Sequence, residues 1–78
     1  MSSLEDRETP GVHSAIKEAI REVGTEADGA EVPRALERAA LKAQSTEDRV
    51  EAEFEEMKRR GEVYVVPAED GDRVKVTP

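Results

Sequence analysis

The stretch that decides the fold is residues 50–66, VEAEFEEMKRRGEVYVV, in which the spacing of apolar residues changes at Gly61. Before Gly61, Val50, Phe54 and Met57 recur at the i, i+4, i+7 spacing of an amphipathic helix. The basic residues at the end of this helix complement its dipole, and a glycine is suited to end it. The pattern therefore predicts a helix that leads directly into a strand.

Two strands are predicted after that glycine. Residues 63–66 are β-branched or aromatic, and residues 73–77 alternate polar and apolar side chains. The intervening residues 67–72 combine Pro, Gly and acidic residues, which predicts a turn and an antiparallel hairpin packed on the helices. In the second strand we expect two valines to face the core and two bases to face water: Val74 and Val76, and Arg73 and Lys75.

A first helix is predicted near the N-terminus. Thr9 is suited to be its N-cap and Pro10 its first residue, and Gly24 is suited to end it in the left-handed conformation. Its apolar stripe follows helical spacing and consists of Val12, Ile16, Ile20 and Val23. Residues 1–8 are polar and charged, so we expect them to form a mobile tail.

A second helix is predicted between these two. Val32 precedes Pro33 and is pushed toward extended geometry, so residues 30–32 are consistent with a short strand. Pro33 then fits the first turn of a helix that runs to about Lys42. Its predicted apolar side consists of Leu36, Ala39, Ala40 and Leu41. The last helix follows a short connection and is capped by Ser45 or Thr46.

This order of elements is that of a winged helix-turn-helix, an α+β fold of three helices with a C-terminal β-hairpin as the wing. A chain of 78 residues has room for one such domain, which we assign to residues 9–78. Its core is expected to centre on Ile16, Leu36 and Phe54. No run approaches the ~20 apolar residues of a membrane span, and the N-terminus lacks a secretion signal. We therefore expect a cytoplasmic protein with no membrane contact. The leading Met and the polar tail favour a free-standing protein, and an excised domain is the alternative.

The chain is acidic throughout. It has 12 Lys and Arg against 19 Asp and Glu, a formal net charge of −7, and Arg is the more frequent base. A surplus of carboxylates with few lysines is typical of a halophilic, archaeal proteome, where counterions screen the self-repulsion. An ordinary acidic protein is the alternative, and the composition leaves both open.

The sequence offers no catalytic constellation. The chain has no Cys, His13 is its single His, and no carboxylate partner for it can be named from the sequence. Glu51 and Glu55 are spaced i, i+4, but on so acidic a helix they indicate a solvated face. Residues 69–72 lack the ligand spacing of a calcium loop. We expect no enzyme, no cofactor, no metal site and no small-molecule substrate.

The predicted third helix is a poor DNA reader. Its outward side would carry acids at positions where direct readout needs Arg, Lys, Asn or Gln. The candidate residues for contact with DNA or a partner are instead the bases at the helix end and on the wing: Lys58, Arg59, Arg60, Arg73 and Lys75. The alternative is that they complement the helix dipole and solvate the strand. Tyr64 is either an exposed anchor for a partner or an edge-of-core residue.

Residues 50–64, VEAEFEEMKRRGEVY, resemble the end of the C-terminal winged-helix domain of archaeal minichromosome maintenance helicases. Residues 29–32 and 36–39 resemble the second-helix region of the same domain. The chain has no phosphate loop, so the resemblance concerns this appendage alone. It implies an accessory or regulatory module in DNA replication or another nucleic-acid transaction, with weak DNA contact, protein contact or both. A purely protein-binding winged helix and a transcription regulator are the alternatives.

Overall fold

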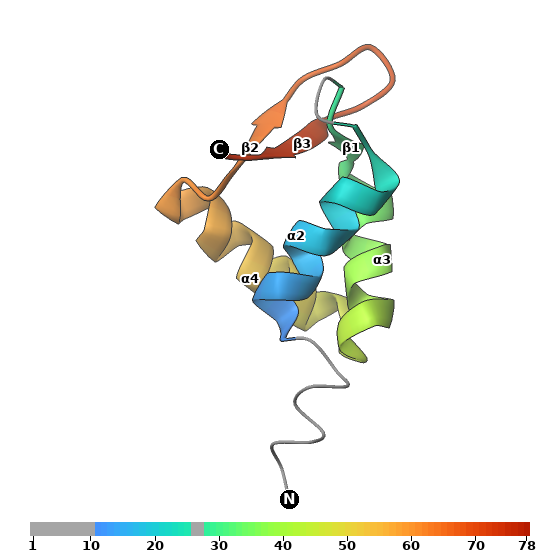
Figure 1. The fold of residues 1–78 in the computed structure, drawn as a ribbon, viewed down its shortest axis with the longest axis vertical. Coiled ribbons are helices and arrows are strands. Elements are labelled where there is room, and N and C mark those ends of the chain that lie inside the picture. The colour runs from blue at the N-terminus through green and yellow to red at the C-terminus, as the bar shows by residue number, and fades with distance from the viewer. Residues whose placement is uncertain (1–10, 26–27) are drawn as a thin grey trace, which may run out of the picture.

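A computed structural model describes residues 11–25 and 28–78 of the chain (Figure 1). Within these residues the elements are α2 (Val12–Val23), β1 (Ala30–Glu31), α3 (Val32–Ala43), α4 (Glu47–Arg60), β2 (Val63–Val66) and β3 (Arg73–Val76). The predicted α+β arrangement, with three helices and a hairpin after the last of them, is confirmed in this part of the chain. The short strand before α3 is confirmed as well.

The sheet is antiparallel, with β3 in the centre between β1 and β2. Figure 1 shows it lying across one end of the helices. Tyr64 is opposite Lys75 and Val65 is opposite Val74 in the β2–β3 ladder. Because side chains alternate along a strand, one face of the hairpin is apolar and faces the helices, and the other carries Tyr64, Val66, Arg73 and Lys75. Val74 and Val76 therefore face inward as predicted.

The core is built from small and medium side chains of all three helices and the sheet. Ile16 and Phe54 are buried as expected, whereas Leu36 is only partly buried and lies at the edge of the core. The reason is that α3 turns its alanines toward α2: Ala35, Ala39 and Ala43 are buried. Leu41, expected on the apolar side of this helix, is 71% exposed. The Leu41 prediction was wrong, and Leu36 packs against the core without lying at its centre, because the alanine stripe sets the buried face of α3.

The ends of α4 match the prediction. The Thr46 hydroxyl accepts a hydrogen bond from the Arg49 backbone N–H at 3.3 Å, so Thr46 is the N-cap. Gly61 has φ 80° and ends the helix in the left-handed conformation. At the other end of the domain, α2 begins at Val12 with Gly11 as its N-cap. The predicted start at Thr9 and Pro10 and the predicted tail, residues 1–8, lie outside the described residues.

Gly24 ends α2 for a different reason from the one predicted. Its φ of −122° is extended, not left-handed, so the expected left-handed stop was wrong. A Cβ on Gly24 would lie 2.2 Å from the Gly29 carbonyl oxygen and 2.6 Å from the Ala30 Cα. Glycine is needed here because the backbone leading into β1 passes directly over the end of α2.

Candidate nucleic-acid interface

The bases at the end of α4 are paired with acids of the same helix. Lys58 Nζ lies 3.0 Å from Glu55 Oε2 and 5.3 Å from the centre of the Phe54 ring. Arg59 lies 3.1 Å from Glu56. These pairs follow from i, i+3 spacing, which brings side chains together on one helix face. The positive charge of this turn is therefore largely compensated where it arises.

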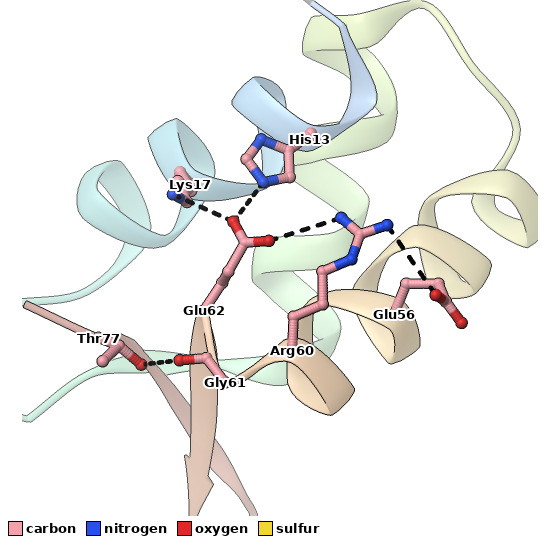
Figure 2. Close-up of polar contacts among 7 residues, drawn as sticks. All are labelled: His13, Lys17, Glu56, Arg60, Gly61, Glu62 and Thr77. Atoms are coloured by element: carbon pink, nitrogen blue, oxygen red, sulfur yellow. Dashed lines mark hydrogen bonds and ion pairs between the residues drawn. The ribbon is translucent and has the colours of Figure 1, made fainter.

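Arg60 belongs to a network centred on Glu62, which Figure 2 shows in close-up. One carboxylate oxygen of Glu62 lies 2.5 Å from His13 Nε2 and 3.3 Å from Lys17 Nζ. Its other oxygen lies 3.5 Å from Arg60, whose guanidinium also lies 4.0 Å from Glu56. Glu62 thus joins α2 to the junction of α4 and β2.

His13 therefore has the carboxylate partner that the sequence did not reveal. The His13 hydrogen bond lowers the pKa of Glu62, partial burial opposes this change, and Lys17 adds to the lowering. A second tie holds the same junction, because the Thr77 hydroxyl donates to the Gly61 carbonyl oxygen at 2.6 Å. Local spacing does not predict that Glu62 joins these elements, since its two partners on α2 lie 49 and 45 positions away in the sequence.

The wing bases are also engaged. Arg73 lies 3.2 Å from Asp70 of the turn, and its side chain is 27% exposed. Lys75 is partly buried and already makes an interaction within the chain. Arg73 is opposite Val66 at the far end of the hairpin, about 10 Å along the strand from the point where β2 leaves α4. The structure therefore places the five candidate bases in separate groups rather than along one continuous edge.

The exposed side of α4 is acidic, as the sequence predicted. Asp48, Glu51 and Glu55 are all exposed, whereas Val50, Phe54 and Met57 point into the core. Carboxylates at these positions repel phosphate and offer no donor to a base edge. The helix that would read DNA in other winged helices is therefore unsuited to do so in this chain.

Two basic residues of α3, Arg38 and Lys42, form ion pairs with acids of α2. Glu22 of α2 lies 2.6 Å from Lys42 and 3.0 Å from Arg38, both of α3. The Lys42 and Arg38 hydrogen bonds lower the pKa of Glu22, and the same contact raises the pKa of Lys42. Glu18 lies 3.4 Å from Lys42 as well. These pairs fasten α2 to α3 and leave little positive charge on that surface.

Two large apolar side chains are exposed among the described residues, Leu41 and Tyr64. Tyr64 is 45% exposed, so the alternative that places it at the edge of the core was wrong. The sequence missed Leu41, because a leucine beside two alanines was expected to contribute to the core. An exposed Tyr is a typical anchor for a protein partner, whereas a single exposed Leu is common on protein surfaces.

No protein-family model, curated protein or solved structure matches the chain. The resemblance to the minichromosome maintenance winged helix therefore stays a prediction from residues 50–64. Within the described residues, no three His, Asp or Glu side chains gather in a way that could hold a metal ion. None of the helices in that part of the chain is long and apolar enough to cross a membrane.

Proposed function

We propose that this chain is a non-enzymatic winged-helix module that works through contact with a protein partner. Its setting would be DNA replication or another nucleic-acid transaction in the cytoplasm, as the resemblance of residues 50–64 implies.

One observation carries the choice of protein over DNA. Lys58, Arg59, Arg60 and Arg73 each lie within 4.0 Å of a carboxylate, and the exposed face of α4 is acidic. Binding to DNA draws its free energy from bases that neutralise phosphates and release counterions. In this chain each such base would first have to leave its carboxylate, and the net charge of −7 opposes the approach.

Weak, salt-sensitive DNA contact at the end of α4 is the second candidate. Arg59 and Arg60 have side chains that are 77% and 55% exposed. Exposed ion pairs contribute little free energy, about 0–1 kcal/mol, so an arginine can exchange a carboxylate for a phosphate. A transcription regulator receives less support, because it would use α4 as a reading helix.

Titration of labelled duplex, forked and single-stranded DNA across a salt series tests the choice. We expect no measurable binding at physiological salt and, at low salt, at most binding whose log affinity hardly depends on log salt. Arg59→Ala and Arg73→Ala are the informative variants, and Arg34→Ala on α3 is the matched control. A steep salt slope that both variants reduce, and the control does not, would overturn the protein-contact proposal in favour of DNA.

A further inference from the structure

A groove of about 630 Å³ lies between the end of α2 and the second half of β3. Ile20 and Val76 contribute its apolar wall, and the exposed Tyr64 lines it from the other face of the hairpin. Arg21 and Lys75 are its basic side chains. The groove therefore combines apolar and positively charged side chains, on a molecule whose net charge is −7.

One wall of this groove is an open edge of the sheet. Ala30 is opposite Val74, and the Val32 backbone N–H donates to the Asp72 carbonyl at 3.3 Å. Because backbone groups alternate in direction along an antiparallel strand, those of Val76 point to the same side as those of Asp72 and Val74. Among the residues that the structure describes, no strand pairs with Val76 on that side, because β1 has only two residues.

Gly29, the residue before β1, still lies against β3. A Cβ on Gly29 would lie 2.9 Å from the Lys75 side chain, and the Gly29 N–H, which faces away from β3, donates to the Thr25 carbonyl at 2.7 Å. Thr25 and Gly29 form an isolated bridge of their own. Val76 borders the groove, where an extended segment of another chain can align with its backbone.

Arg21 gives the groove a charge that is not committed elsewhere. Among the described residues Arg21 makes no ion pair. Arg49 of α4 is the other arginine in this part of the chain that makes none. Arg21 is exposed and lies in the last turn of α2. Its guanidinium can accept a carboxylate from a partner without first losing one of its own.

We infer that this groove binds a short extended peptide of a partner protein in which apolar and acidic side chains alternate. Successive side chains of an extended chain point to opposite faces, so the apolar ones pack on Ile20 and Val76 while a carboxylate meets Arg21. The peptide backbone continues the sheet at Val76, on the side of β3 that faces away from β2. This inference rests on the proposed protein-binding function and specifies its partner.

The apolar wall favours a peptide over a nucleic acid. A site for single-stranded nucleic acid needs several basic side chains along the path of the phosphates, with aromatic side chains between them that stack on the nucleobases. The groove has one aromatic ring, and of its two bases Lys75 already makes an interaction within the chain. An apolar side chain, in contrast, finds two aliphatic partners here.

The experiment uses the full chain and an end-blocked hexapeptide of alternating leucine and aspartate. Tyr64 is the single Tyr and the chain has no Trp, so intrinsic fluorescence reports on this groove alone. We expect a saturable fluorescence change, accompanied by amide shifts at Arg21 and Val76 in ¹H–¹⁵N spectra. Arg21→Glu should weaken binding roughly tenfold, since it removes a charge-assisted contact. Arg49→Glu is the matched control and should leave the affinity unchanged.

Three results would overturn the inference. The first is the absence of both the fluorescence change and the amide shifts up to the solubility limit of the peptide. The second is equal weakening by Arg21→Glu and Arg49→Glu. The third is tighter binding of oligo-dT than of the peptide at the same amides. If the peptide does not bind in the groove and the DNA titration is also negative, the proposed protein contact stands and its surface lies elsewhere. DNA binding with a steep salt slope would refute the proposed function itself.

Discussion

Replacing Gly24 by a residue with a Cβ should weaken the junction between α2 and the sheet. The added atom would lie 2.2 Å from the Gly29 carbonyl oxygen, whereas ordinary contacts begin at 3.4 Å. The difference, 3.4 − 2.2, requires the facing backbone to retreat by about 1.2 Å. That backbone carries the Gly29–Thr25 hydrogen bond and leads into the pairing of Ala30 with Val74. The retreat therefore loosens β1 as well as the helix end.

The expected cost follows from this clash. Forced overpacking costs about 1–3 kcal/mol, against a total stability of about 4–12 kcal/mol for a domain of this size. At about 4–8 °C per kcal/mol, the melting temperature of Gly24→Ala should fall by about 4–24 °C, measured by circular dichroism. Gly11→Ala is the matched control, because a Cβ there meets nothing within 4 Å and its φ of −65° suits alanine. Because Gly11 is the N-cap of α2 and alanine is a poorer N-cap than glycine, that variant should lose about 1 kcal/mol or less.

A second variant separates the two reasons for a glycine. If Gly24 were needed for a left-handed conformation, Gly24→Asn would be tolerated much better than Gly24→Ala, because asparagine adopts that conformation readily. If the close approach is the reason, Asn brings the same Cβ and more atoms behind it. We expect Gly24→Asn to be at least as destabilising as Gly24→Ala. A nearly wild-type melting temperature for Gly24→Asn would refute the close-approach argument.

Four further measurements test other parts of the structure. Phe54→Ala, at a side chain 3% exposed, should cost about 3–5 kcal/mol in urea denaturation, and a loss below about 1 kcal/mol would remove Phe54 from the core. Gln44→Gly, at the left-handed C-cap of α3 with φ 51°, should add roughly 0.5–1 kcal/mol, and a loss of stability would contradict a strained cap. Because the folded-state pKa of Glu62 is lowered, its stabilising effect is present above the unfolded value of 4.5 and is lost as the pH falls through the folded value. Glu62→Gln should therefore lose less stability than the wild type on acidification, and superimposable pH profiles would speak against this network. Thermal melts from low to molar KCl should show rising stability if the protein is adapted to high salt, and flat or falling melting temperatures would favour an ordinary acidic protein.

The sequence was sufficient where local signals agree with one another. In α4 the cap at Thr46, the i, i+4, i+7 apolar spacing and the terminal Gly61 all point to the same helix, and the structure has it. The change to alternating residues likewise placed β2 and β3. Such signals need no knowledge of what lies across the core, so they can be read from neighbouring residues alone.

The sequence was insufficient where distant segments decide the outcome. Leu36 and Leu41 were expected in the core, but close packing of α3 on α2 through alanines turns both leucines outward to different degrees. Gly24 is explained by the backbone at Gly29, and Glu62 by partners on α2. In each case the determining contact is tertiary, and residue propensity carries no information about it.

The candidate site shows the same division. The acidic side of α4 could be predicted from the helical wheel, and it already argued against DNA readout. The separation of Arg73 from the end of α4 follows from the length of the hairpin. Arg21 is a candidate for contact with a partner because the other basic residues of α2 and α3 form ion pairs within the chain. The sequence alone cannot distinguish an arginine that forms an ion pair within the chain from one that is available to a partner.

Salt acts on this molecule in two opposite ways, and their balance bears on how it recognises a partner. Screening weakens the pairs that join elements, such as those of Glu22 and Glu62, and it also relieves repulsion among the exposed carboxylates of α4. If stability rises with salt, repulsion dominates, and the protein works where long-range steering by charge is suppressed. Recognition must then depend on contacts made at short range. An apolar wall beside an open strand edge, with Arg21 meeting a carboxylate directly, keeps most of its affinity under such conditions, whereas a phosphate-binding edge at Arg59 and Arg60 would lose it.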